Sequence, residues 1–228
     1  MKHDPVISLL GTAALLLEAP GETALPMQQK IWALSKDVVH WPEVLEAVPG
    51  MNNLMICFKR PPADPQPFIN RLKSAWLVVE PLTVEGRTIA LPVIYGGEAG
   101  PHIGDVVAHT GLSVEEIAEI HSTPLYPVYA LGSHPGYCYL GGMDPRIATP
   151  RRKTPVLKIP GGAVSIGGFQ TGVSASDGPS GWNTIGSTTM TFFDVNKNPP
   201  TLLQPGDMIR FTIEKVGSVI RARWIVWR

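Results

Sequence analysis

Hydrophobic positions in the first third of the chain switch between strand-like and helix-like spacing. Residues 6–10 and 13–18 form short apolar runs on either side of Gly11, which predicts two strands joined by a turn. Apolar side chains then recur at helical spacing at Met27, Ile31, Leu34 and Val38. Because Pro26 suits the first turn of a helix, this pattern predicts a first helix that begins near that residue.

The same order of elements is repeated immediately afterwards. Residues 44–48 and 54–58 flank the turn sequence PGMNN, which indicates a hairpin, and a second helix is expected to begin at Asp64 and Pro65. Its apolar side is Ile69, Leu72 and Trp76. The order of two strands, a helix, two strands and a helix predicts a small α+β domain over residues 1–84, with both helices on one face of a sheet.

The pattern changes from residue 88 onward. Residues 89–95 are strand-like, and residues 100–122 contain two short helical patterns separated by Gly111. Ser113 and Glu116 have the spacing of a capping box, which marks the start of the second of these helices.

The remainder is interrupted by glycine and proline so often that short strands and tight turns are expected in place of helices. This holds for residues 132–189, and strand-like runs follow at residues 190–195, 208–214 and 220–226, the last with one apolar and one basic face. Residues 85–228 are therefore expected to form a mainly β domain, a barrel or a sandwich.

Charge and cysteine content narrow the classes of function. The chain has 19 basic and 19 acidic side chains, so no electrostatic reason exists for binding nucleic acid or an anionic membrane. Two cysteines are too few for a disulfide framework, and the N-terminal segment is broken by Pro5 and Gly11 where a signal peptide has an unbroken apolar run. The longest apolar run of the chain, residues 13–17, is far shorter than a membrane-spanning helix. We expect a cytoplasmic protein.

No familiar catalytic or metal-binding motif is complete. The chain lacks a phosphate loop ending in Gly-Lys-Ser/Thr, a G-x-S-x-G elbow and an HExxH helix, and its histidines are scattered. We therefore expect no metal site.

Residues 132–155 carry the side chains most typical of a binding loop, since they combine arginines, a histidine and tyrosines, including Tyr137, with many Gly and Pro residues. His134 lies in this segment and is a candidate general acid or base; the alternative is an exposed loop histidine. His121 lies near the end of a predicted helix, whose dipole favours a protonated imidazole; it is either catalytic or a partly buried, hydrogen-bonded side chain.

Five further residues are candidate contacts for a small ligand. Arg151 and Arg152 are adjacent in an extended segment, so they point to opposite faces and one can bind a carboxylate or phosphate in a cleft while the other pairs elsewhere. Gln170 and Thr171, flanked by glycines, could present an amide and a hydroxyl to a ligand. Trp182 could form the floor of a pocket or fill the core.

Several long motifs together resemble one known family. They are PGYCYLGGMDPRIATPRRKTP at 135–155, IPGGAVSIGGFQTG at 159–172, GPSGWNTIGST at 178–188 and LLQPGDMIRF at 202–211. These motifs are similar to those of the family of 5-oxoprolinase B subunits, whose relatives include sporulation-kinase inhibitor proteins, allophanate hydrolase subunit 1 and the carboxyltransferase domain of urea carboxylase and urea amidolyase. The resemblance covers nearly the whole chain.

The resemblance implies a small α+β domain followed by a cyclophilin-like β-barrel. It also implies an ATP-dependent opening of 5-oxoproline to glutamate, carried out together with a second barrel subunit, C, and a separate subunit, A. ATP would then be bound at an interface with a partner subunit. For this reaction, the candidates named above would act as follows. The proton carriers would be His134 and His121. The substrate-binding residues would be Arg151, Arg152, Gln170, Thr171, Tyr137 and Trp182.

Two departures from the family pattern bear on the substrate. Ser133 stands where the family has an aromatic residue, and residues 173–175 read Val-Ser-Ala where the family has an Ile-Tyr-Pro sequence. These changes are expected to alter the pocket or the partner surface. The alternatives to the enzyme subunit are a regulatory binding protein of the kinase-inhibitor type and a carboxyltransferase-like or allophanate-hydrolase-related subunit with a different small amide substrate; the chain contains no biotin-carrier Met-Lys-Met sequence.

Overall fold

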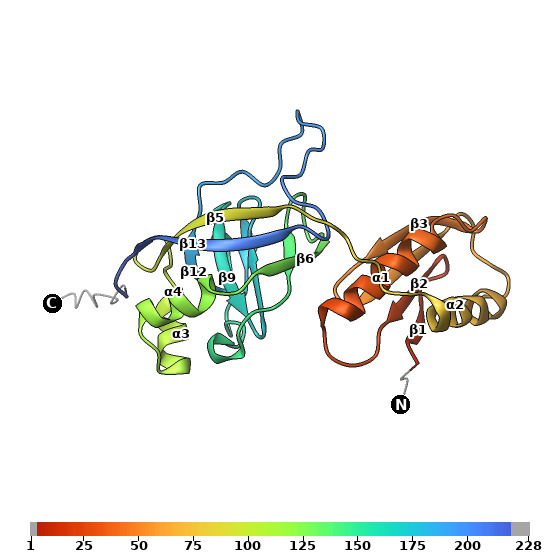
Figure 1. Cartoon of the computed structure of the whole chain (residues 1–228), viewed down its shortest axis with the longest axis horizontal. Coiled ribbons are helices and arrows are strands. Elements are labelled where there is room, and N and C mark those ends of the chain that lie inside the picture. The colour runs from red at the N-terminus through yellow and green to blue at the C-terminus, as the bar shows by residue number, and fades with distance from the viewer. Residues whose placement is uncertain (1–3, 220–228) are drawn as a thin grey trace. The chain divides into compact units, whose positions relative to one another are not determined.

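The computed structural model describes residues 4–219, and the strand predicted at residues 220–226 lies outside this range (Figure 1). Contacts between residues divide the chain into two compact units, with the boundary between residues 85 and 86. The sequence predicts two domains, residues 1–84 and 85–228. A domain is a part of the chain that folds on its own, so this domain division stays a prediction.

The first unit is a four-stranded antiparallel sheet with two helices. Its strand order is β1-β2-β4-β3, in which β1 pairs with β2, β2 with β4 and β4 with β3. The elements are β1 (Val6–Leu10), β2 (Ala14–Glu18), α1 (Leu25–Val38), β3 (Val44–Pro49), β4 (Asn53–Phe58) and α2 (Gln66–Val78). All six elements that the hydrophobic pattern predicts are confirmed.

Alternating burial explains how this sheet meets its helices. Leu15 and Leu17 of β2 and Leu54 and Ile56 of β4 are fully buried, whereas the residues between them are partly exposed. These side chains form one hydrophobic cluster with the buried residues of α1 and α2, so both helices cover the same face of the sheet.

The second unit is a mainly β barrel. Within residues 86–219, seven strands close in the order β10-β7-β6-β13-β5-β12-β9, and the long β5 and β13 run parallel to each other. The barrel strands are β5 (Thr88–Tyr95), β6 (Tyr126–Leu131), β7 (Cys138–Leu140), β9 (Ala163–Gly167), β10 (Gln170–Val173), β12 (Asn183–Ser187) and β13 (Met208–Val216). A separate two-stranded sheet pairs β8 (Val156–Ile159) with β11 (Gly178–Ser180), and a short 3-10 helix, η1, spans Pro145–Ile147.

Two short helices pack against the barrel and share its core. They are α3 (Ile103–Thr110) and α4 (Val114–Ser122), and Gly111 between them has a φ of 76° that suits a helix C-terminus. The Ser113 hydroxyl accepts a hydrogen bond from the backbone N–H of Glu116, and the Glu116 carboxylate accepts one from the backbone N–H of Ser113. The predicted capping box is confirmed.

The strand predicted at residues 190–195 is wrong. In the described part of the chain, only Phe193 of this segment forms a bridge, an isolated one with Thr201. The Asp194 carboxylate accepts a hydrogen bond from the backbone N–H of Asn196 at 3.0 Å, which turns the chain where the apolar run ends. Phe192 is buried because it fills the barrel core, and not because it belongs to a strand.

Cys57 and Cys138 are both free thiols. No helix within residues 4–219 has the length and the apolar character needed to cross a bilayer. In the same range, no three His, Cys, Asp or Glu side chains come together as a group that could hold a metal ion.

Candidate functional site

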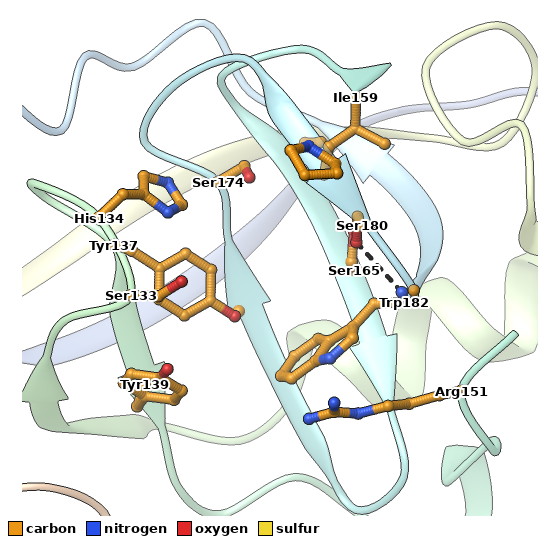
Figure 2. Close-up of a pocket in the computed structure, with 14 residues that line it drawn as sticks. Ser133, His134, Tyr137, Tyr139, Arg151, Ile159, Ser165, Ser174, Ser180 and Trp182 are labelled. Atoms are coloured by element: carbon orange, nitrogen blue, oxygen red, sulfur yellow. Dashed lines mark hydrogen bonds between the residues drawn. The ribbon is translucent and has the colours of Figure 1, made fainter. Parts of the chain in front are cut away.

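A cavity of about 250 Å³, called the outer pocket below, lies on the outer face of the barrel (Figure 2). Its lining is rich in hydroxyl groups and combines residues from three barrel strands with residues from the loops and the β8–β11 sheet. The lining residues are Ser133, His134, Tyr137, Tyr139, Arg151, Ile159, Ala163, Ser165, Gly172, Ser174, Pro179, Ser180, Gly181 and Trp182. A cavity of this size and polarity suits one small polar molecule.

The strand alternation places the pocket outside the barrel. In β9, Val164 and Ile166 point into the hydrophobic core, so Ser165 between them points outward. Gly172 of β10 pairs with both Ser165 and Tyr139, which puts these three positions side by side across three adjacent strands. They form the base of the outer pocket.

Two glycines allow aromatic rings to approach the strands closely. A Cβ atom at Gly172 would lie 2.7 Å from the Tyr137 hydroxyl, and a Cβ atom at Gly167 would lie 2.6 Å from the Trp182 ring. Both distances are too short for a side chain. The glycines therefore let Tyr137 and Trp182 stand as facing walls of the outer pocket (Figure 2).

The two arginines differ in their relation to the outer pocket. Arg151 lines the outer pocket, and its guanidinium lies 5.6 Å from the centroid of the Trp182 ring. Arg152 is not among the residues that line this pocket, and it forms an ion pair with Asp105 of α3. Arg151 is the arginine that is available to an anion in the pocket.

His134 presents a nitrogen atom without a protein partner. Its Nε2 atom is buried, and no hydrogen-bond partner for it exists among the described residues. Burial lowers the pKa of His134 below its ordinary value, so the imidazole is neutral at neutral pH and can accept a proton. Burial also raises the pKa of the Tyr137 phenol well above its usual range, which keeps it a neutral hydrogen-bond donor.

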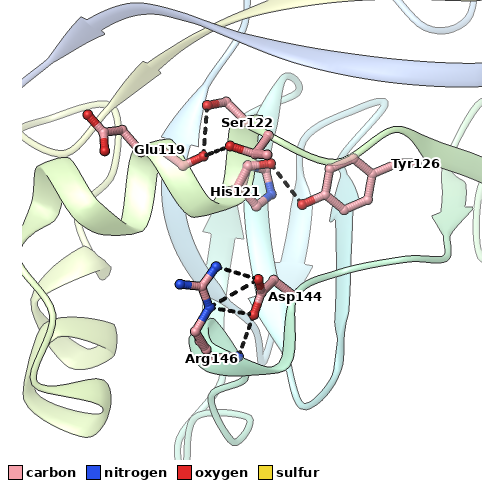
Figure 3. A network of polar contacts seen from close by, with 7 residues as sticks. Glu119, His121, Ser122, Tyr126, Asp144 and Arg146 are labelled. Carbon is pink, nitrogen blue, oxygen red and sulfur yellow. Dashed lines mark hydrogen bonds and ion pairs between the residues drawn. The ribbon is translucent and has the colours of Figure 1, made fainter.

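His121 is not in the outer pocket but in the core of the barrel unit. It is fully buried, with Nδ1 2.8 Å from the Tyr95 hydroxyl and Nε2 2.8 Å from the Thr171 hydroxyl. Its backbone carbonyl accepts a hydrogen bond from the Tyr126 hydroxyl (Figure 3). Burial lowers the pKa of His121 to about 3, so the expectation that the helix dipole keeps it protonated is wrong.

Thr171 shares this location, because its side chain points into the barrel. It is fully buried, and its hydroxyl is hydrogen-bonded to His121 and to the backbone carbonyl of Ser165. Neither His121 nor Thr171 can reach a ligand in the outer pocket. Gln170, at the start of β10, is also not among the residues that line it.

Four predicted candidates thus come together, namely His134, Tyr137, Arg151 and Trp182. The two departures from the family pattern lie at the same place, since Ser133 and Ser174 both line the outer pocket. Sequence reasoning missed Tyr139, Ser165 and Ser180. The signal for Ser165 was present as a single polar residue between two buried apolar residues of a strand.

Comparison with known proteins points to one family. The family described as the carboxyltransferase domain, subdomain C and D, matches residues 5–203. The chain is 43% identical over 209 residues to a protein of Escherichia coli O157:H7 named as the B subunit of 5-oxoprolinase, with 92% of this chain and 96% of that protein covered. A protein of the same name from Haemophilus influenzae is 38% identical over 207 residues, with 91% and 97% covered.

A solved structure shares the fold. The crystal structure of TTHA0988 matches with a TM-score of 0.72 at 29% identity over 91% of this chain. This chain spans only 41% of that longer protein.

Proposed function

The chain belongs to the family of 5-oxoprolinase B subunits, and we propose that it acts as the B subunit of an enzyme that opens 5-oxoproline to glutamate with the use of ATP. The relatives that carry this name are matched over nearly their whole length. The reaction needs a site for a small molecule with one carboxylate and one lactam. The outer pocket would serve as such a site, and we place the reaction in the cytoplasm.

A single observation carries this assignment. Arg151 is an exposed cation at the edge of a small, hydroxyl-lined cavity, and no ion pair within residues 4–219 occupies its guanidinium. A guanidinium binds a carboxylate through two parallel hydrogen bonds. Arg151 would hold the carboxylate of 5-oxoproline, with the ring directed toward Tyr137 and Ser165.

The remaining lining groups fit the chemistry of the lactam. The neutral Tyr137 hydroxyl and the serine hydroxyls would donate hydrogen bonds to the lactam oxygen and to the phosphoryl group that it receives from ATP. Opening the C–N bond requires that water add to the carbonyl carbon and that the nitrogen take up a proton. The neutral His134 would accept the proton from water at Nε2 and return it to the nitrogen.

ATP would supply the activation that a stable amide requires: its terminal phosphoryl group is transferred to the lactam oxygen and ADP leaves. Addition of water and cleavage of the C–N bond then give an acyl phosphate, which a second water hydrolyses to glutamate and phosphate. We propose that partner subunits A and C complete the site. Leu157 lies on the same side of β8 as Ile159 of the outer pocket and is 92% exposed, and Phe169 in the turn between β9 and β10 is 77% exposed. Apolar side chains as exposed as these suit coverage by a partner protein.

The test is the variant Arg151→Gln in the complex with subunits A and C. A hydrogen-bonded pair with a charged group contributes about 1.5–3 kcal/mol, so kcat/KM for 5-oxoproline is expected to fall roughly 10- to 150-fold. Arg60→Gln, in the first unit, is the matched control and should leave kcat/KM unchanged. Full activity in Arg151→Gln would remove Arg151 from the site.

A further inference from the structure

A second depression, called the basic groove below, adjoins the outer pocket. Its volume is about 390 Å³, and Arg151 lines both hollows. Its other lining residues come from α3, from the segment after η1 and from the start of β12: Asp105, His109, Thr149, Pro150, Arg152, Lys153, Thr154 and Asn183.

The charges in the basic groove are unbalanced. Arg151, Arg152 and Lys153 are three consecutive cations, and Asp105 is the one acidic residue in the lining. Asp105 is already paired with Arg152. Across residues 4–219, no ion pair involves Arg151 or Lys153, so two formal positive charges are left for an anion.

The backbone that carries these cations is held at three successive points. Thr149 and Gly168 exchange two backbone hydrogen bonds, at 3.2 and 2.7 Å. The Asn183 amide donates to the carbonyl of Pro150 at 2.9 Å, and the backbone N–H of Arg152 donates to the carbonyl of Gly181 at 2.8 Å. A segment fixed in this way loses little conformational entropy when a ligand binds.

Arg152 also has an unused donor. Its Nε atom is buried, and no hydrogen-bond partner for it exists in the described structure. A buried donor of this kind costs free energy unless it finds an acceptor. An anionic oxygen in the basic groove would supply that acceptor.

We propose that the basic groove binds the phosphate chain of a nucleoside triphosphate, with Arg151 between that chain and the small molecule in the outer pocket. This inference rests on the proposed function and adds that this chain itself contributes the phosphate site. A single carboxylate would use one cation, whereas linked phosphates present oxygens along a chain and match several adjacent cations. Placing both ligands on either side of one guanidinium holds the phosphate chain next to the small molecule.

The test measures binding of inorganic tripolyphosphate to the full-length chain by titration calorimetry at low ionic strength, followed by ATP as a competitor. Micromolar to millimolar binding that ATP displaces is expected. Lys153→Gln should weaken tripolyphosphate binding roughly tenfold, whereas Lys36→Gln, which removes the same charge from the last turn of α1, should not. Asp105→Asn should tighten binding, because it removes the negative charge from the groove.

The tightening by Asp105→Asn distinguishes an anion site from a structural effect, since misfolding does not increase affinity. Absence of tripolyphosphate binding, equal losses in Lys153→Gln and Lys36→Gln, or no tightening in Asp105→Asn would each overturn the inference. Glutamate formation by the complete complex is measured separately. A complex that forms glutamate while this chain fails to bind tripolyphosphate would refute the basic groove and leave the proposed function intact.

Discussion

The guanidinium of Arg151 lies against the indole ring of Trp182, 5.6 Å from its centroid. Figure 2 shows the arginine passing beneath the ring at the edge of the outer pocket. A contact of this kind contributes about 0.5–1 kcal/mol at an exposed site. It orients the one cation that the outer pocket and the basic groove share, so the position of Trp182 controls the position of Arg151.

Gly167→Ala tests this dependence without changing any polar group. A Cβ atom at residue 167 would lie 2.6 Å from the Trp182 ring, so the ring must move. We expect KM for 5-oxoproline to rise several-fold in the complex and the free energy of unfolding to fall by about 1–3 kcal/mol. Steady-state kinetics and urea denaturation give the two values.

Gly178→Ala is the matched control. No atom lies within 4 Å of the Cβ position at Gly178, so KM and stability should both stay at the wild-type level. An unchanged KM in Gly167→Ala would show that Trp182 does not position the substrate anchor.

His134→Gln tests the proposed proton carrier. Because burial lowers the pKa of His134, the neutral form predominates at neutral pH, and wild-type kcat/KM should fall only as the pH drops below the ordinary histidine value of about 6.5. The variant should lose roughly 10²-fold or more in kcat and should lack this decrease at acid pH. His40→Gln, in the first unit, should keep both the rate and the pH profile.

The burial of His121 leads to a separate prediction, namely that the free energy of unfolding depends on pH. The pKa of His121 is about 3 in the folded chain and about 6.5 when unfolded, so between these values only the unfolded state binds the proton. Stability is therefore complete above pH 6.5 and falls by up to about 1.4 kcal/mol per pH unit as the pH decreases toward 3. Urea denaturation from pH 7 to pH 4.5 should show a steeper loss in the wild type than in His121→Gln; equal slopes would contradict a buried neutral imidazole.

The removal of the Asp207 carboxylate is expected to lower the stability of the barrel unit. Asp207 is fully buried, it pairs with Arg87 at 2.6 Å, and it accepts hydrogen bonds from the backbone N–H groups of Arg87 and Gln204. Asp207→Ala leaves these donors without an acceptor and should lower the free energy of unfolding by about 3 kcal/mol. Asp177→Ala, which removes an exposed partner of Lys158, should change the midpoint of urea denaturation little; similar losses in both variants would contradict this role.

Periodic and capped segments were predictable from the sequence, because their signals are local. Both helices of the first unit, the capping box at Ser113 and the strand at residues 208–214 are confirmed. The error at residues 190–195 has a physical cause: an apolar run indicates burial, and Phe192 is buried from a loop. Barrel closure depends on pairing between distant strands, and the cyclophilin-like assignment stays a prediction.

The residues of the site could be predicted only where the neighbouring residues in the sequence determine the direction of a side chain. An extended backbone predicted that only one of the two arginines enters a cleft, and Arg151 alone lines the outer pocket, although both arginines line the basic groove. The glycines on either side of Gln170 and Thr171 do not determine which way the Thr171 side chain points. It faces the core because of the register in which β10 pairs with β9. Ser165 and Ser180 line the same pocket only because strands and loops far apart in the sequence converge.

The most direct measurement of the central claim is glutamate release from 5-oxoproline by this chain mixed with its own subunits A and C, with and without ATP and with each subunit omitted in turn. ATP-dependent glutamate that disappears when this chain is left out is the predicted result. No glutamate from a complex that assembles fully would contradict the account, and it would mean that Ser133 and Ser174 line a pocket for a different molecule.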